Sequence, residues 1–359
     1  GIDAQGRISC FGNNDVYGQI SQYPNGEFTH LDVGKEHACA VDFDGKIQCW
    51  GDNTYGETRN VNFRGANLSG ARLVGTMASN ADFSDAILSN ADISRSDLRN
   101  TSFSGADLSN AELSGCTISG ADLHSAVMVG IKFDEFVRAQ VDTRNSITEA
   151  NVGISLSELE QPLAHLIEVH RLWVRTVGKE GRQLDLSGYD LRELDELIEE
   201  KLTGIKACQT RFFGMSLYRI ELQSATLDGS DFQQCDLEGA DLRGSSFRGT
   251  IFNHANMRSV NFNPLIFGQK GSDSYREQYC DLEGAYFRYV DLLDSKLRGV
   301  NLKGADLSYA NLTKCDLRDA DLTGAYIENI VLTNAKLSGT IFDERQMEYL
   351  ESQNINIKS

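Results

Sequence analysis

The chain has 359 residues, of which 52 are acidic and 34 basic, so its formal net charge is −18. This balance argues against a protein that binds nucleic-acid phosphates or a basic membrane surface, and three prolines with 24% charged residues argue against a disordered chain. No apolar run approaches the roughly 20 residues of a membrane-spanning helix, so we expect no membrane insertion.

Residues 1–59 contain two similar segments. Residues 1–12 align without gaps on residues 40–51, and each copy predicts a short strand, a glycine turn and a second short strand. Residues 34–41 followed by residues 49–51 resemble the blades of regulator-of-chromosome-condensation propellers. Fewer than two units are present, which is too few to close a propeller. The resemblance therefore implies a partial propeller-like β unit, which could end a longer array lying before Gly1, and it does not carry over that family's exchange or chromatin activities.

Three side chains of this segment need an interpretation. Cys39 and Cys49 flank the predicted hairpin, so a disulfide and two buried thiols both remain open. His37 belongs to the blade pattern, and we interpret it as a structural histidine.

A repeat of five residues begins at Val61 and continues to residue 133. Its centres are large and apolar, as at Phe103 and Leu108, and the residue two positions before each centre is mostly small, as at Ala106. On an α-helix a period of five would spread the large residues around the axis, and on a flat strand it would place them on alternate faces. A chain that bends after every five residues keeps both kinds of residue inside, and four such sides make a coil of twenty residues.

Residues 136–209 break the repeat and predict helices. Pro162 precedes an amphipathic pattern that includes Leu163, Leu166 and Ile167 and stops at Gly178. A second amphipathic helix is predicted over residues 191–202. We expect both helices to cover the exposed end of a stack of coils.

The repeat resumes over residues 210–343, with an interruption at residues 263–279. Segments such as residues 106–110 and 305–309 resemble the pentapeptide-repeat proteins, and this resemblance implies right-handed quadrilateral β-helices. Cys116, Cys235, Cys280 and Cys315 occupy the small interior position, where they serve as apolar fillers. The interrupting loop is either tolerated decoration or a binding loop.

The predicted fold is mainly β, with two right-handed quadrilateral β-helix solenoids separated by a short helical segment and an N-terminal partial propeller-like unit. The expected domains are residues 1–59 (propeller-like), 60–135 (first solenoid), 136–209 (helical linker or cap), 210–343 (second solenoid) and 344–359 (C-terminal cap, with a short helix at about 343–352).

The sequence offers no catalytic, cofactor or metal motif, so we expect no enzyme activity and no cofactor. Units four apart in the repeat share a side of the solenoid, which places Tyr289 and Tyr309 one coil apart and Tyr286 and Tyr326 two coils apart. With Arg288 between them, these tyrosines form a predicted protein-binding face, because tyrosine supplies a large contact area at a small entropy cost. The alternative interpretation is scattered surface aromatics.

Two functions follow from these features. The first is a non-catalytic protein-protein interaction scaffold, or a structural subunit of a larger assembly, whose protein partner the sequence does not name. The second is a DNA mimic that binds a type II topoisomerase, as some pentapeptide-repeat proteins do. The two solenoids carry only a small share of the −18 net charge, which disfavours the mimic because B-DNA carries about one negative charge per 1.7 Å. The sequence does not indicate a compartment.

Overall fold

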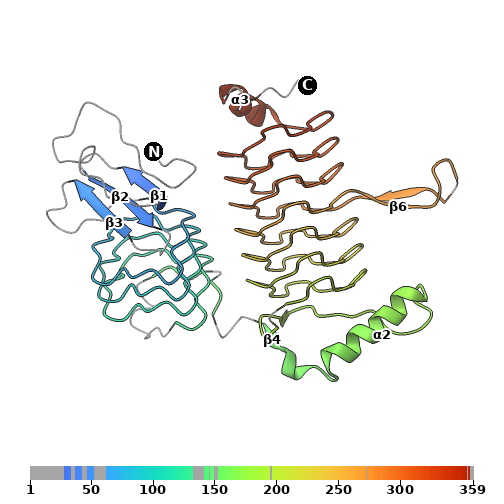
Figure 1. Ribbon diagram of the computed structural model, residues 1–359, viewed down its shortest axis with the longest axis horizontal. Coiled ribbons are helices and arrows are strands. Elements are labelled where there is room, and N and C mark those ends of the chain that lie inside the picture. Colours follow the sequence, from blue (N-terminus) through green and yellow to red (C-terminus); the bar gives the residue numbers. More distant parts are fainter. Residues whose placement is uncertain are drawn as a thin grey trace. The chain divides into compact units, whose positions relative to one another are not determined.

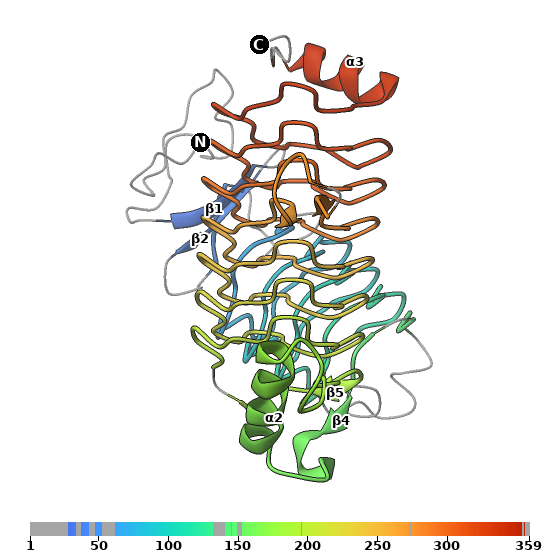
Figure 2. The ribbon, with the colours of Figure 1, turned by 90° about the vertical axis from the view of Figure 1, so that its right-hand side faces the viewer.

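The computed structural model of the protein describes residues 28–33, 37–42, 47–51, 62–131, 141–144, 146–148, 153–194, 196–272, 274–353 and 355. The chain divides into two compact units, Gly1–Val152 and Gly153–Ser359. Each unit is described by itself, and both are drawn in Figures 1 and 2.

The first unit begins with a small antiparallel sheet. Strands β1 (Phe28–Val33), β2 (His37–Asp42) and β3 (Ile47–Gly51) are hydrogen-bonded in the order β1-β2-β3, so the hairpin predicted for the second copy is confirmed. Its register places Cys39 directly opposite Cys49. The side chains of His37, Cys39 and Cys49, and the whole of the first copy, lie outside the described residues.

From Asn62 the chain winds into coils that are joined by four rows of parallel bridges. Successive partners in a row are twenty residues apart, as in the row through Asn62, Asp82 and Ser102. Each side of a coil ends in a tight turn: the Ala71 N–H donates to the Leu68 carbonyl (3.0 Å), and Gly70 between them has φ +67°. A left-handed third residue is the requirement of a type II turn. The predicted bend at every fifth residue is therefore confirmed.

The interior of the first unit contains the large and small residues of the repeat, as predicted. The rings of Phe63, Phe83 and Phe103 stack in a column with centroids 5.2 and 5.3 Å apart, and alanines such as Ala86 and Ala106 are fully buried between the coils. The bridges continue past the predicted boundary at residue 135, since Val127 pairs with Ile147.

The second unit opens with a short strand, β4 (Ile154–Ser155), a 3₁₀ turn, η1 (Leu156–Glu158), and the predicted helix, α2 (Leu163–Arg175). Pro162 is the N-cap of α2, as its fixed φ favours. The helix packs against the first coil through Ile167 and His170, both buried, and Trp173 lies so close to Gly204 that a Cβ there would meet the ring at 3.2 Å.

The second predicted helix, residues 191–202, is wrong. These residues belong to the first coil of the second unit: β5 (Tyr189–Asp190) pairs with β4, and Glu196 and Lys201 bridge to Ser216 and Glu221. The step between Asp190 and Glu196 contains six residues, while the steps around it contain five. This one-residue insertion breaks the five-residue period. It leaves apolar residues at the three- and four-residue spacings that are typical of an amphipathic helix.

The second ladder runs from Asp185 to Ile341, so it starts well before residue 210. Its interior holds a stacked column of phenylalanines, in which Phe212 and Phe232 have centroids 4.3 Å apart and Phe252 and Phe287 4.9 Å apart. Where the small position carries a donor, it donates to the carbonyl of a centre in the previous coil: Ser245 Oγ donates to Leu222 (2.5 Å) and Cys315 Sγ to Leu292 (2.9 Å). The interior is thus apolar with every such donor satisfied.

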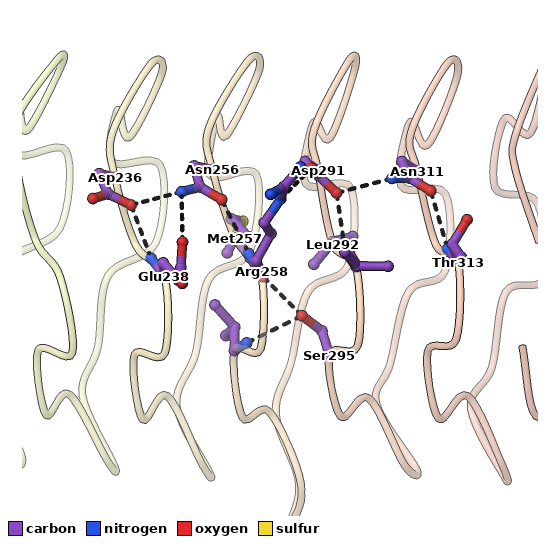
Figure 3. Close-up of polar contacts among 12 residues, drawn as sticks. Asp236, Glu238, Asn256, Met257, Arg258, Asp291, Leu292, Ser295, Asn311 and Thr313 are labelled. Carbon is purple, nitrogen blue, oxygen red and sulfur yellow. Dashed lines mark hydrogen bonds and ion pairs between the residues drawn. The ribbon is translucent and has the colours of Figure 1, made fainter. Parts of the chain in front are cut away.

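Most outward positions of the second unit carry polar ladders. Figure 3 shows one of them, in which the Asn311 side-chain amide donates to Asp291 Oδ1 (2.9 Å) and Arg258 Nε donates to Asp291 Oδ2 (2.6 Å). To the left of this pair in Figure 3, the Asn256 amide donates to Asp236 Oδ1 (2.9 Å). Such acid–amide pairs occupy the bridge positions of this side of the coil.

The interruption at residues 263–279 forms a two-stranded hairpin of β6 (Leu265–Phe267) and β7 (Arg276–Gln278), which projects from the stack (Figure 1). Ile266 on β6 is 59% exposed. The Arg276 guanidinium lies over the Phe267 ring, 4.4 Å from its centroid.

The predicted C-terminal helix is confirmed as α3 (Glu344–Ser352), which begins with a capping box between Asp343 and Gln346. Side chains of α3 and its cap satisfy backbone groups of the last coil. Asp343 Oδ2 accepts from the Gly324 N–H (2.9 Å) and the Tyr349 hydroxyl accepts from the Asn329 N–H (2.7 Å). The Gln346 amide donates to the Leu322 and Ala325 carbonyls, both at 2.7 Å.

Candidate interaction site

The predicted tyrosines lie on one outward side of the second unit. Tyr286, Asp306 and Tyr326 are consecutive members of one bridge row, so Tyr286 and Tyr326 are two coils apart, as predicted. Tyr286 is 46% exposed and Tyr326 is 63% exposed. We use the name tyrosine face for the outward side chains of this side: His254, Tyr286, Arg288, Tyr289, Asp306, Tyr309 and Tyr326.

A column of three aromatic rings stands beside this row. Tyr289 and Tyr309 stack with centroids 4.7 Å apart and planes inclined by 12°, as predicted. His254 extends the column by a second stacked pair, 5.0 Å from Tyr289 with an angle of 3°. The column therefore crosses three coils.

The three residues of the column have left-handed backbones. His254 has φ +60°, Tyr289 φ +58° and Tyr309 φ +63°. These are turn positions at which the repeat usually has glycine, asparagine or aspartate, and a tyrosine with positive φ costs on the order of 1 kcal/mol. Each stacked pair stabilises the fold by about 0.5–1.5 kcal/mol. Stacking therefore offsets part of the backbone strain that these residues have at positive φ and that a glycine would not have.

Charged groups lie between the tyrosines. Arg288 Nε is 3.6 Å from Asp306 Oδ2, and the backbone N–H of Arg288 donates to Asn253 Oδ1 (3.0 Å). The Tyr309 hydroxyl lies 3.4 Å from Glu328 Oε1, which it can reach as a donor. Within the part of the chain that the structure describes, no lysine or arginine lies within ion-pair distance of Glu328.

The tyrosine face continues into a pocket at the C-terminal end of the stack. The pocket has a volume of about 310 Å³ and lies between the last coil and α3. Tyr326 and Tyr349 line it together with Glu328 and Arg345. The Asp343 carboxylate in its wall has a lowered pKa because it accepts backbone hydrogen bonds, first from Gln346 and then from Gly324.

The sequence reasoning missed His254, Asp306 and Glu328. The hairpin hides the first of these: bridge partners across it are 35 residues apart, while in the next coils they are 20 apart. His254 is therefore not found by counting back in twenties from Tyr289. Subtracting the fifteen extra residues of the hairpin would have placed it. Asp306 could have been found by its position halfway between Tyr286 and Tyr326.

The base of the hairpin forms a second polar group. The hydroxyls of Tyr275 and Tyr279 both donate to the Glu277 carboxylate. These bonds lower the pKa of Glu277 and raise the pKa of both tyrosines. The polar groups of all three side chains are therefore hydrogen-bonded within this group.

The described residues show no group of three or more histidine, cysteine or acidic side chains that could hold a metal ion. None of the described helices is long and apolar enough to cross a membrane.

Comparison with protein families identifies the repeat. The model of pentapeptide repeats matches residues 59–95, 91–130, 217–263, 278–304 and 301–339, which together cover just over half of the chain. The chain belongs to the pentapeptide-repeat family. Its coils are therefore those of the pentapeptide-repeat β-helix. The model of the regulator of chromosome condensation (RCC1) repeat matches residues 28–57, in agreement with the resemblance stated above.

Solved structures of the family are similar to this chain. HetL, a pentapeptide repeat protein involved in heterocyst differentiation regulation from the cyanobacterium Nostoc sp. strain PCC 7120, is 24% identical, with 80% of this chain and 92% of HetL covered and a TM-score of 0.27. QnrB1, a plasmid-mediated fluoroquinolone resistance protein, is 14% identical, with coverage of 82% and 98% and a TM-score of 0.27. These values carry no argument about function. No match was found among curated proteins.

Proposed function

We propose that this pentapeptide-repeat protein is a non-catalytic protein-protein interaction scaffold, or a structural subunit of a larger assembly, and that it binds its partner through the tyrosine face. The observation that carries the proposal is the aromatic column of His254, Tyr289 and Tyr309. Here three consecutive coils place an aromatic residue at a turn position that elsewhere in the repeat mostly holds glycine, asparagine or aspartate, and the three rings stack on one another.

The packing of this side also supports a docking role. Outward residues of a solenoid are expected to be exposed, yet the neighbouring outward side chains Asn253 and Ser308 are only 7% and 5% exposed. Side chains that are already packed lose little rotational freedom when a partner binds. Exposed Tyr286 and Tyr326 then supply the contact area.

The architecture that we propose for this function has two right-handed quadrilateral solenoids separated by the helical segment around α2, with the RCC1-like segment as a partial propeller unit. A protein partner, without nucleic acid and without membrane insertion, fits this arrangement. The alternative is a DNA mimic that binds a type II topoisomerase. It is disfavoured because outward acids are neutralised by arginines, as in the Arg258–Asp291 and Arg318–Asp316 ion pairs at 2.6 Å.

The test replaces the two stacked tyrosines. The double variant Tyr289→Ser, Tyr309→Ser is expected to fold normally, since Ser224 and Ser259 already occupy equivalent left-handed positions at φ +55° and +57°. Affinity purification from the source organism, followed by mass spectrometry, is expected to recover a stable partner with the natural chain and to lose it with the double variant.

The matched control is Tyr218→Ser, because Tyr218 lies on another side of the stack, where it contacts Arg219. This control is expected to retain the partner. Recovery of the same partner by the double variant would overturn the proposal, and recovery of a topoisomerase whose supercoiling activity the protein blocks would favour the mimic.

A further inference from the structure

We infer that the tyrosine face binds a proline-rich segment in the polyproline II conformation that carries basic residues. This inference rests on the proposed function and specifies its partner. Proline-rich segments in this conformation bind to aromatic-lined surfaces in several kinds of recognition domain. The tyrosine face offers two exposed ridges, Tyr286 and Tyr326, with the shorter Asp306 between them.

The spacing of the ridges is the first argument. Tyr286 and Tyr326 are two strand spacings apart, which is about 9.6 Å. Polyproline II rises about 9.3 Å in each three-residue turn. A turn of α-helix rises about 5.4 Å, and every second residue of an extended strand is about 6.7 Å along. Two turns of α-helix rise about 10.8 Å, so of these three conformations polyproline II matches the separation of the two tyrosines most closely.

The shape between the ridges is the second argument. Asp306 is the bridge partner of both tyrosines. Its side chain is shorter than theirs and lies 3.6 Å from Arg288 Nε. Ser308 beside it is buried, while the stacked rings of Tyr289 and Tyr309 stand at the next turn position. A proline ring suits packing against the exposed tyrosine rings because it is compact and apolar and has no backbone N–H to satisfy.

Charge is the third argument. The tyrosine face and the adjoining pocket hold the carboxylates of Asp306 and Glu328, and Arg288 already contacts the first of them. Glu328, by contrast, is exposed, and among the described residues its carboxylate has only the 3.4 Å contact with the Tyr309 hydroxyl. It lies in the pocket beside Tyr326 and Tyr349, where Glu328 and Asp343 outnumber Arg345 among the charged lining residues. Aromatic rings beside a net negative charge suit an arginine or lysine side chain.

The probe is a synthetic nine-residue peptide of three Pro-Pro-Arg repeats, in which the three-residue period places all arginines along one edge. A peptide of three Gly-Ser-Arg repeats has the same charge without the conformation, and a peptide of three Pro-Pro-Glu repeats has the conformation with the opposite charge. Isothermal titration calorimetry of the full chain is expected to show binding of the first peptide at least tenfold tighter than of the other two.

Variants then locate the site. Tyr286→Ala and Tyr326→Ala are each expected to weaken binding of the Pro-Pro-Arg peptide at least tenfold, Glu328→Gln severalfold, and the control Tyr218→Ala not at all. Equal binding of the Gly-Ser-Arg peptide, an equal loss with Tyr218→Ala, or no binding of the Pro-Pro-Arg peptide would overturn the inference.

The outcome also separates this inference from the proposed function. If the peptide does not bind but partner capture still requires Tyr289 and Tyr309, the scaffold function stands and the partner is of another kind. If capture survives the double variant, the proposed function fails whatever the peptide does.

Discussion

The interior phenylalanine column gives a quantitative prediction for Phe232→Ala. Phe232 is fully buried and its ring contacts three others: Phe212 at 4.3 Å, Phe252 at 5.3 Å, both stacked, and Phe247 edge-on at 6.1 Å. Removing a buried phenylalanine side chain costs about 3–5 kcal/mol, because transfer energy is lost and the cavity collapses only partly. This is a large share of the roughly 5–15 kcal/mol that stabilises a typical domain.

The assay is urea denaturation followed by far-UV circular dichroism, with Tyr218→Ala as the matched control. Tyr218 is a half-buried outward side chain that contacts Arg219, so the control is expected to cost about 1 kcal/mol. Because each coil contacts only its neighbours, the loss at Phe232 is also expected to make unfolding less cooperative. Equal changes in the free energy of unfolding for the two variants would refute the assignment of this column as the main core.

Two further predictions concern titrating groups. Burial raises the pKa of the Cys280 and Cys315 thiols to about 12. We therefore expect neither thiol to react with a thiol reagent at pH 8 in the native chain, and both to react in urea. Labelling of either cysteine in the native chain, located by mass spectrometry, would contradict their buried placement. Asp343→Ala is expected to destabilise α3 by about 1 kcal/mol. Because the pKa of Asp343 is lowered in the folded chain, this stabilisation is present above the ordinary carboxyl pKa of about 4 and is lost as the pH falls through the lowered pKa. A difference in thermal stability between the variant and the natural chain that is the same at pH 7 and pH 2.5 would contradict it.

The fold could be predicted from the sequence wherever the five-residue period is unbroken. Residues 62–131 and the coils from Phe212 onward repeat one local geometry, in which turn, interior pair and outward residue are set within five positions. The errors occur where the period shifts. At residues 191–202 one extra residue changes the register, and the apolar residues Leu191, Leu194 and Leu202 alone do not distinguish a bent coil from a helix.

The candidate site was predictable to the extent that it depends on the repeat. The stack of Tyr289 on Tyr309 follows from their separation of twenty residues. The contribution of His254 was not visible, because the hairpin changes that separation. The contribution of Glu328 depends on where α3 folds back to form the pocket, and no local period specifies that contact.

The way in which α3 ends the stack has a consequence for the length of the protein. Within the stack, the Gly304 N–H donates to the Thr323 carbonyl and the Tyr309 N–H to the Glu328 carbonyl. At the last coil the equivalent donors, Gly324 and Asn329, are satisfied by the side chains of Asp343 and Tyr349. The terminal helix and its cap thus satisfy backbone groups of the last coil with three side chains, those of Asp343, Gln346 and Tyr349. Whole coils of twenty residues could be inserted or deleted upstream without changing the contacts between α3 and the last coil. The number of coils can therefore change in evolution independently of the cap.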